Sequence, residues 1–230
     1  TLVVDVALEE MIININEVKI VGTKNGEVVN EMVSVSGRAF SVAEAERYAG
    51  SRGDPARMAS NFAGVSGTDD TRNDLVIRGN SPLGVAYRLD GVNIPNPNHF
   101  AVTGSAGGPV GMLNNKVLAS SDFLTGAFPA EFGNSLAGSF DLKFRKGITN
   151  RHEFTLQAGI FGAEATGEGP SGKANAGGQR ASYLFNFRYA TLSLFSAMGI
   201  DIGTTAIPKY GDMAFKLIFP LKKGSELSVF

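Results

Sequence analysis

The loop at residues 93–100 carries the side chains in this chain that are best suited to hold a ligand. It reads Asn-Ile-Pro-Asn-Pro-Asn-His-Phe and includes His99, one of two histidines in the sequence. A metal site needs several ligands at close spacing, and His99 has no second His, no Cys and no paired carboxylate near it; His152 lies in another segment. The residue types therefore favour a stiff exposed turn, or a ligand-binding loop on a rigid scaffold, over a metal centre.

The sequence contains none of the motifs that carry catalysis or bind nucleotides. GxSxG, HExxH and the P-loop GxxxxGK[ST] are absent, and the glycine-rich stretch at 104–108 is not followed by Lys and Ser or Thr. That stretch is better explained as a loop. We therefore expect that the protein is not an enzyme and that it needs no cofactor.

The overall composition excludes some partners and leaves the compartment open. A net charge of −1 gives no electrostatic basis for binding nucleic acid. Without any Cys the chain has no disulfide framework, which fits a periplasmic protein and a cytosolic one equally well. The sequence shows neither a signal peptide nor a run of about 18 apolar residues. A spanning helix is therefore excluded, whereas a membrane barrel remains possible because its strands need only alternation.

In the first part of the chain, short strand-like runs each break at a glycine. Glycine reaches backbone angles that other residues adopt only at a cost, so we expect a turn or a close approach of the chain at each break. The runs and the glycines that follow them are 75–78 with Gly79, 85–90 with Gly91, and 122–125 with Gly126.

Two short helices are expected before these strands. Ser41 and Glu44 have the spacing of a capping box, in which each side chain satisfies a free amide at the start of a helix. Asp54 followed by Pro55 is a favoured start for the second helix, and Gly64 is placed to end it.

Three longer motifs follow one another along the chain. They are Asn-Asp-Leu-Val-Ile-Arg-Gly-Asn-Ser-Pro at 73–82, Tyr-Arg-Leu-Asp-Gly-Val at 87–92 and Pro-Ala-Glu-Phe-Gly-Asn at 129–134. In this order they resemble the plug domain of TonB-dependent outer-membrane transporters, especially the Bacteroidetes type that carries an N-terminal carboxypeptidase-regulatory-like domain. The resemblance implies an α+β fold, in which a plug domain with a small mixed sheet and short helices is followed by an incomplete antiparallel β-barrel segment.

The resemblance divides the chain into three parts. Residues 1–10 alternate weakly and are expected to be the end of an N-terminal β-sandwich domain. Residues 11–148 would form the TonB-dependent receptor plug domain, and residues 149–230 the first strands of a truncated transmembrane β-barrel. Because the sequence opens on Thr1 rather than Met and stops inside a strand-like stretch, we expect it to be a fragment of a longer protein.

After Gly147 the pattern changes to alternating apolar and polar residues, at 152–160, 181–189 and 212–221. Alternation is typical of membrane strands and equally of a soluble antiparallel sheet with one buried face. The resemblance favours the membrane, and so do the lengths, since roughly 9–11 residues cross the hydrocarbon. The apolar face would then contact outer-membrane lipid, and the longer segment at 196–211 would be an extracellular loop.

The function that the resemblance implies is energy-coupled import of a scarce ligand across the outer membrane, with the plug closing the barrel lumen and responding to the TonB complex. The ligand, a small molecule or an oligomeric nutrient, is not identified by the sequence. The alternative is a soluble or surface-anchored β-rich binding module without transport, whose apolar faces pack on each other. A third possibility is signalling through an N-terminal domain, of which residues 1–8 preserve too little to decide.

A contact with a TonB-type energy transducer is implied at Glu17, Val18, Lys19, Ile20 and Val21, which are similar to the extended TonB-box segment of the family. An extended peptide of this kind can add a strand to the exposed sheet edge of a partner. The other explanation is that these residues form the ordinary first strand of the plug sheet.

Two more sets of site residues follow from the same resemblance. Charged groups on the flank of a plug would meet a polar barrel wall, where buried charge must be paired; the alternative is the solvated surface of a soluble domain. These plug-to-barrel candidates are Arg78, Arg88, Asp90 and Glu131. The loop at the plug apex would face outward and help to hold the ligand, and its candidates are Asn96, Asn98, His99 and Phe100.

Overall fold

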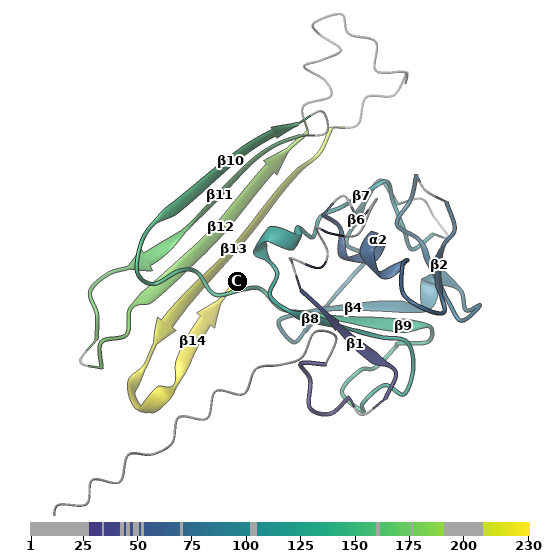
Figure 1. Ribbon diagram of the computed structural model, residues 1–230, viewed down its shortest axis with the longest axis horizontal. Helices are drawn as coiled ribbons and strands as arrows, with labels where there is room; N and C mark the ends of the chain where they lie inside the picture. Colours follow the sequence, from purple (N-terminus) through teal and green to yellow (C-terminus); the bar gives the residue numbers. More distant parts are fainter. Residues whose placement is uncertain are drawn as a thin grey trace, which may run out of the picture.

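The computed structural model is built almost entirely of strands, which form two units. It describes residues 28–33, 35–41, 44, 47, 51, 53–69, 71–101, 105–159, 162–175, 177–190 and 209–230. Figure 1 shows a unit of short strands and helices, here called the first unit (described residues between 28 and 148), beside a sheet of long strands. The expected sandwich remnant at 1–10 and the candidate transducer contact at 17–21 lie outside the described residues.

A five-stranded mixed sheet forms the base of the first unit. Its spatial order is β1-β8-β9-β4-β5, with β4 and β9 parallel and the other neighbours antiparallel. The small mixed sheet expected for a plug is therefore present. The strands are β1 (Gly37–Phe40), β4 (Val85–Leu89), β5 (Val92–Ile94), β8 (Ser121–Leu124) and β9 (Gly138–Leu142).

Shorter elements cover this sheet. Two small hairpins pair β2 with β3 and β6 with β7. Their bounds, and those of the helical turns, are β2 (Val65–Gly67), β3 (Leu75–Ile77), β6 (Asn98–His99), β7 (Val110–Gly111), α2 (Pro55–Ala59), η1 (Pro82–Gly84) and η2 (Asn115–Val117).

The start of α2 is the one that the sequence predicts, but its end is not. The Asp54 carboxylate accepts hydrogen bonds from the amides of Ala56 (2.8 Å) and Arg57 (3.3 Å), with Pro55 in the first turn. The helix ends at Ala59 rather than near Gly64, because the chain turns at Ser60, whose hydroxyl bonds back to the carbonyl of Arg57. Of the other expected helix, Glu44 and Arg47 are described and are helical, and the Ser41 hydroxyl accepts from the Glu44 amide.

Two of the predicted glycine breaks are tight two-residue turns, of which the one at Gly91 joins the paired strands β4 and β5. Arg78 and Gly79 have φ of 49° and 80°, and Asp90 and Gly91 have φ of 46° and 86°. Positive φ at two successive residues is the pattern of the two-residue turn that matches the twist of antiparallel strands. The third break is different, because the residue with positive φ there is Ala127 and not Gly126.

The core of the first unit lies between its sheet and the helical turns. The rings of Phe123 and Phe140, both fully buried, are 4.5 Å apart between centroids, and Tyr87 stacks on Phe140 at 5.0 Å. Met58 of α2 is fully buried against the same cluster. Large apolar side chains packed in this way supply most of the stability of a small domain.

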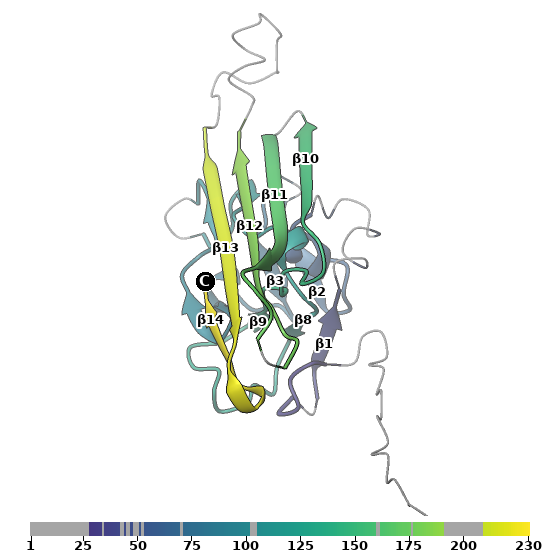
Figure 2. The same cartoon turned by 90° about the vertical axis from the view of Figure 1, so that its left-hand side faces the viewer.

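The second unit is an open antiparallel sheet, here called the long sheet, whose strands follow one another in sequence order. Figure 2 shows the strands β10 to β13 side by side with the first unit behind them. Three of them have 9 or 10 residues, enough to reach across a bilayer when tilted. The elements are β10 (Glu153–Gly159), β11 (Gly162–Ser171), β12 (Ala181–Tyr189), β13 (Gly211–Pro220), η3 (Lys222–Gly224) and β14 (Glu226–Val229).

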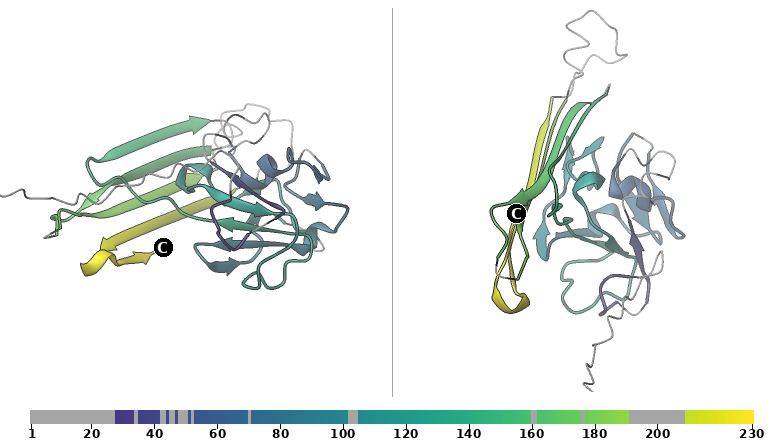
Figure 3. Two further views of the ribbon diagram at one scale, coloured as in Figure 1. Left: turned by 60° about the horizontal axis from the view of Figure 1, so that its bottom comes forward. Right: turned by 60° about the vertical axis from the view of Figure 1, so that its left-hand side comes forward.

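The two faces of the long sheet differ in polarity. One cross-strand row joins Leu156, Ala165, Phe187 and Met213, and Leu156 and Met213 are 84% and 70% exposed. The face with Glu168, Asn186 and Lys216 is buried against the first unit instead. The right-hand view of Figure 3 shows the long sheet nearly edge on, with the first unit on one side only. The aromatic face is therefore left uncovered, and the polar face is the packed one.

No helix in the described part of the chain is long and apolar enough to cross a membrane.

Candidate functional site

The two units meet through buried ion pairs. Nζ of Lys216, in the middle of β13, donates to Oδ2 of Asp90 at 2.7 Å and to the carbonyl of Phe144 at 3.2 Å. Both charged side chains are largely buried, with 9% and 13% of their surface exposed. A buried charge is tolerated where it is paired and hydrogen-bonded. Asp90 lies in the turn between β4 and β5, so this contact fixes that turn against the long sheet.

A second ion pair, buried at its carboxylate and partly buried at its guanidinium, holds the segment that leads from β9 into the long sheet. The guanidinium of Arg145 contacts the Glu168 carboxylate of β11 through two parallel bonds of 2.5 and 2.6 Å. The same carboxylate accepts from the amide of Ile148 at 3.2 Å, and Nε of Arg145 donates to the carbonyl of Lys116. Two-pronged Arg–carboxylate pairs are geometrically specific as well as strong. This pair therefore orients the crossing segment on the sheet.

A third contact is centred on Glu164, four residues before Glu168 on the same strand and nearer to the apical loop. Its Oε1 accepts from the side-chain amides of Asn114 (2.7 Å) and Asn186 (2.8 Å), and Lys116 lies 3.7 Å from its Oε2. Lys116 also contacts the side chain of Gln157 on β10. Polar groups from η2 therefore meet polar groups from three strands of the long sheet.

The apical loop is joined to the long sheet by a cluster of charged and aromatic side chains. Nε2 of His99 lies in hydrogen-bond contact with Oδ1 of Asp212. Nε of Arg188 donates to the other oxygen of Asp212 at 2.9 Å, and Nη2 of Arg188 donates to the carbonyl of Gly111 at 2.5 Å. The ring of Tyr210 is 5.1 Å from that of His99 and lies under the Arg188 guanidinium at 5.5 Å.

The other apical candidates lie in and beside this cluster. Nδ2 of Asn98 donates to Oδ1 of Asn96 at 2.9 Å, so these two residues shape the loop itself. Phe100 has a φ of 57°, which is strained for a bulky side chain, and its ring is about half exposed and 6.2 Å from that of Tyr210. Of the four candidates, Asn96 and Phe100 are exposed, whereas Asn98 and His99 are partly buried.

A buried carboxylate supports the apical loop from below. Asn73 donates both to Oδ2 of Asp54 at 2.8 Å and to Oδ1 of Asn98 at 3.1 Å. Burial raises the pKa of Asp54, and the backbone amides of Arg57 and Ala56 oppose that rise by bonding to the charged form. The cap of α2 and the apical loop therefore share one hydrogen-bond network.

The predicted plug-to-barrel residues do not all lie at the contact with the long sheet. Asp90 reaches it through Lys216. Arg88 instead pairs with Glu131 at 2.8 Å, and Arg78 donates to the hydroxyls of Ser36 and Thr125, all within the first unit. Contacts of Arg78, Arg88 and Glu131 with barrel wall beyond the long sheet stay a prediction.

One anchoring residue, Asp122 of β8, is not among the site residues that the sequence predicts. Its fully buried carboxylate accepts from the amide of Val29 at 2.8 and 3.0 Å and from the amide of Asn30 at 2.7 Å. Glu131 accepts from the side chain of Asn30 as well, and the bonds from Asn30 and Arg88 lower the pKa of Glu131. The usable signal was a carboxylate inside the strand-like run at 122–125. These contacts, here called the N-terminal clamp, hold the chain where residues 1–27 enter the first unit.

Two solved structures that match most of the chain show its fold. A variant of the ferric enterobactin receptor PfeA from Pseudomonas aeruginosa matches 86% of this chain with a TM-score of 0.53 and 16% identity. The siderophore receptor PirA from Acinetobacter baumannii matches 84% of it with the same TM-score and the same identity. The chain has the fold of a TonB-dependent receptor. By sequence, no family model and no curated protein matches it.

The TonB-dependent receptor fold explains why the chain has two units and an open sheet. The chain covers 32% of PfeA and 31% of PirA, so it spans about a third of the length of these receptors. Both neighbours are named as receptors and not as enzymes. Among the described residues, no group of three or more His, Cys, Asp and Glu side chains is placed to hold a metal ion.

Proposed function

We propose that the protein acts in energy-coupled import of a scarce ligand across the outer membrane. In this proposal residues 11–148 are the plug of a barrel whose wall begins with residues 149–230. The observation that carries it is the orientation of the long sheet, whose polar face is buried on the first unit while its aromatic face is exposed. A barrel with a polar lumen and a lipid-facing outer surface requires this orientation.

The alternative, a soluble or surface-anchored binding module, requires the opposite orientation. In such a module the aromatic face of the sheet would be the buried one, because burial of apolar surface drives folding in water. Phe154, Phe187 and Met213 are instead 68%, 48% and 70% exposed. An uncovered apolar surface of this extent is costly in water and normal in lipid.

The N-terminal clamp supports coupling to a TonB-type energy transducer. Force applied through residues 17–21 would pass along the chain to Val29 and Asn30, and from there to Asp122 in the middle of the plug sheet. Three charge-assisted hydrogen bonds to one carboxylate make a stiff connection. The transducer would therefore act on β8 directly, and through β8 on the lumen-closing sheet.

The ligand would be held at the plug apex, where Phe100, Tyr210 and the asparagines of the loop are grouped. One solved neighbour is named a ferric enterobactin receptor and the other a siderophore receptor, so a small iron-chelating molecule is the first ligand class to test. In this proposal the protein needs no cofactor and catalyses no reaction.

Uptake by cells that carry the full-length protein tests the proposal. Proline at position 18 or 20 removes an amide that strand addition to the transducer needs. We expect Val18→Pro and Ile20→Pro to abolish uptake while surface binding of the ligand is unchanged, and the control Val4→Pro to leave both unchanged. Uptake that continues in the two proline variants and without an energised inner membrane would contradict the proposal.

A further inference from the structure

The long sheet carries an excess of positive charge at one of its two ends. The turn between β11 and β12 and the turn between β13 and β14 lie together at the lower end in Figures 1 and 2. The first contains Lys173 and Arg180, and the second contains Lys222; all three side chains are exposed. Neither turn contains an acidic residue.

The acidic residues nearest to this end already have partners. Glu226 of β14 pairs with Lys146 at 2.5 Å, and Glu153 of β10 pairs with Arg151 at 2.5 Å. In the part of the chain that the structure describes, no carboxylate pairs with Lys173, Arg180 or Lys222. These three residues, here called the basic rim, therefore present uncompensated charge.

The opposite end of the sheet differs in charge. The segment between β12 and β13, residues 190–210, contains one acidic residue, Asp201, and one basic residue, Lys209, so it adds no net charge. The positive charge is thus a property of one end and not of the sheet as a whole. Because transmembrane strands bring their two ends to opposite membrane surfaces, the asymmetry distinguishes the two leaflets.

The basic rim borders the aromatic face directly. Phe219, Leu221 and Leu227 are 38%, 50% and 51% exposed next to the turn that carries Lys222. Long basic side chains at the edge of an apolar band can place their charge at the level of lipid head groups while their stems stay in apolar contact. The arrangement therefore suits a membrane surface.

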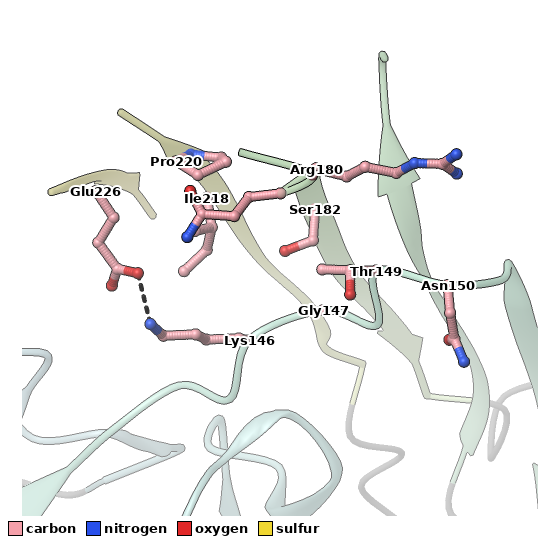
Figure 4. Close-up of a pocket in the computed structure, with 11 residues that line it drawn as sticks. Lys146, Gly147, Thr149, Asn150, Arg180, Ser182, Ile218, Pro220 and Glu226 are labelled. Atoms are coloured by element: carbon pink, nitrogen blue, oxygen red, sulfur yellow. Dashed lines mark hydrogen bonds and ion pairs between the residues drawn. The ribbon is translucent and has the colours of Figure 1, made fainter. Parts of the chain in front are cut away.

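A neighbouring hollow does not account for these charges. It has a volume of about 650 Å³ and lies between residues 146–150 and the ends of β12, β13 and β14. Figure 4 shows that the Arg180 side chain extends away from this hollow, and that Lys146 is engaged with Glu226. Lys173 and Lys222 are not among the residues that line it. The basic rim therefore faces elsewhere.

We propose that the basic rim binds anionic phospholipid head groups of the leaflet at this end of the barrel. Arg180 offers a planar fork that matches a phosphate, and the two lysines offer point charges. Each basic side chain near an anionic membrane surface strengthens binding by about fivefold. The inference rests on the proposed function, because it requires the long sheet to cross a membrane.

An acidic protein is the less favoured partner of the basic rim. The three residues lie on turns at the edge of the apolar band, and the side chain of Arg180 points away from the hollow that this residue borders. A lipid surface needs no hollow, only charge at the right depth beside apolar side chains. Binding of an acidic protein in place of lipid is one outcome of the test below.

The test uses the full-length protein in neutral detergent, with binding of dioctanoyl phosphatidylglycerol and dioctanoyl phosphatidylcholine compared by native mass spectrometry. We expect a preference for phosphatidylglycerol that falls by roughly a hundredfold when Lys173, Arg180 and Lys222 are all replaced by Gln. The matched control is Lys209→Gln, which removes an exposed lysine at the opposite end of the sheet. That variant should keep the preference.

Equal binding of phosphatidylglycerol by the parent protein and the triple variant would overturn the inference and leave the proposed function intact. The same conclusion follows if the triple variant keeps its lipid preference but loses a cross-link to an acidic periplasmic protein. If the full-length protein does not insert into phosphatidylcholine vesicles at all, the proposed function fails first. If the protein inserts but shows no preference for the anionic lipid, the inference about the basic rim fails and the proposed function does not.

Discussion

The two sheets of this molecule bury opposite kinds of surface. The sheet of the first unit packs aromatic rings such as Phe123 and Phe140 into a dry core, as a soluble domain does. The long sheet buries Glu168, Asn186 and Lys216 and leaves Phe187 and Met213 exposed. The difference shows that alternation of apolar and polar residues along a strand does not by itself decide which face is buried. The surface that packs against the sheet decides it. A polar partner on one side leaves the other side for lipid.

The largest effect should separate an aromatic residue in the core from one on the exposed face. Phe140→Ala removes a fully buried ring and should destabilise the full-length protein by about 4 kcal/mol. Phe187→Ala, on the exposed face, should cost less than about 1 kcal/mol in detergent. Denaturant unfolding in one detergent measures both. Equal costs would remove the contrast between the two sheets.

The next effect concerns the buried charge that joins the sheets. Lys216→Met keeps the length of the side chain but leaves the Asp90 carboxylate unpaired, which should destabilise the protein by about 3 kcal/mol. The double variant with Asp90→Asn should recover most of that loss, and Asn tolerates the positive φ at this position. A double-mutant cycle by denaturant unfolding tests the coupling, and additive costs would show that the pair does not hold the sheets together.

The N-terminal clamp should contribute a smaller amount. Asp122→Asn weakens three hydrogen bonds to a charged acceptor and should cost about 2 kcal/mol. Hydrogen exchange at the amides of Val29 and Asn30 should speed up, while exchange in the long sheet stays the same. Asp69→Asn, at an exposed turn outside the clamp, is the control and should not change exchange at these amides. If the amides of Val29 and Asn30 exchange no faster in Asp122→Asn, the N-terminal clamp does not attach this part of the chain to β8.

The smallest effect is the pH dependence that comes from Asp54. Because burial raises its pKa in the folded state, its contribution to stability is complete below the unfolded pKa and is lost as pH rises through the folded value. Asp54→Asn should therefore flatten the decline in stability from acid to neutral pH. Asn at position 54 can still bond to Asn73. Oδ1 of Asn73 has no partner among the described residues, so the Asn73 amide can rotate and accept from the new side chain. If the stability of Asp54→Asn depends on pH in the same way as that of the parent protein, Asp54 is not the source of the decline.

Local features of the structure were predictable from the sequence, and distant contacts were not. The tight turns at Gly79 and Gly91 and the start of α2 at Asp54 depend on a few neighbouring residues, so their signals are local. The alternation of the long strands also predicted which residues share a face. The predicted end of α2 was wrong, because a single turn closed by Ser60 leaves no distinctive pattern in the sequence.

The contacts of the candidate site depend on pairing between distant residues. Lys216 and Asp90 are 126 positions apart, and Val29 and Asp122 are 93 apart, so no spacing in the sequence links them. The sequence identified Asp90 and His99 by residue type and by resemblance, but not their partners in β13. It gave the same weight to Arg88 and Glu131, which bond to each other within the first unit.

The lipid exposure of β13 in the full-length protein tests the central claim most directly. The chain has no Cys, so a single cysteine can be placed in turn at each position from 212 to 219 and spin-labelled. Collision with oxygen, which concentrates in lipid, should be high at 213, 215, 217 and 219 and low at the positions between them. Uniform access to a water-soluble relaxation agent at all eight positions, or the opposite alternation, would contradict the claim that this sheet is a membrane wall around a plug.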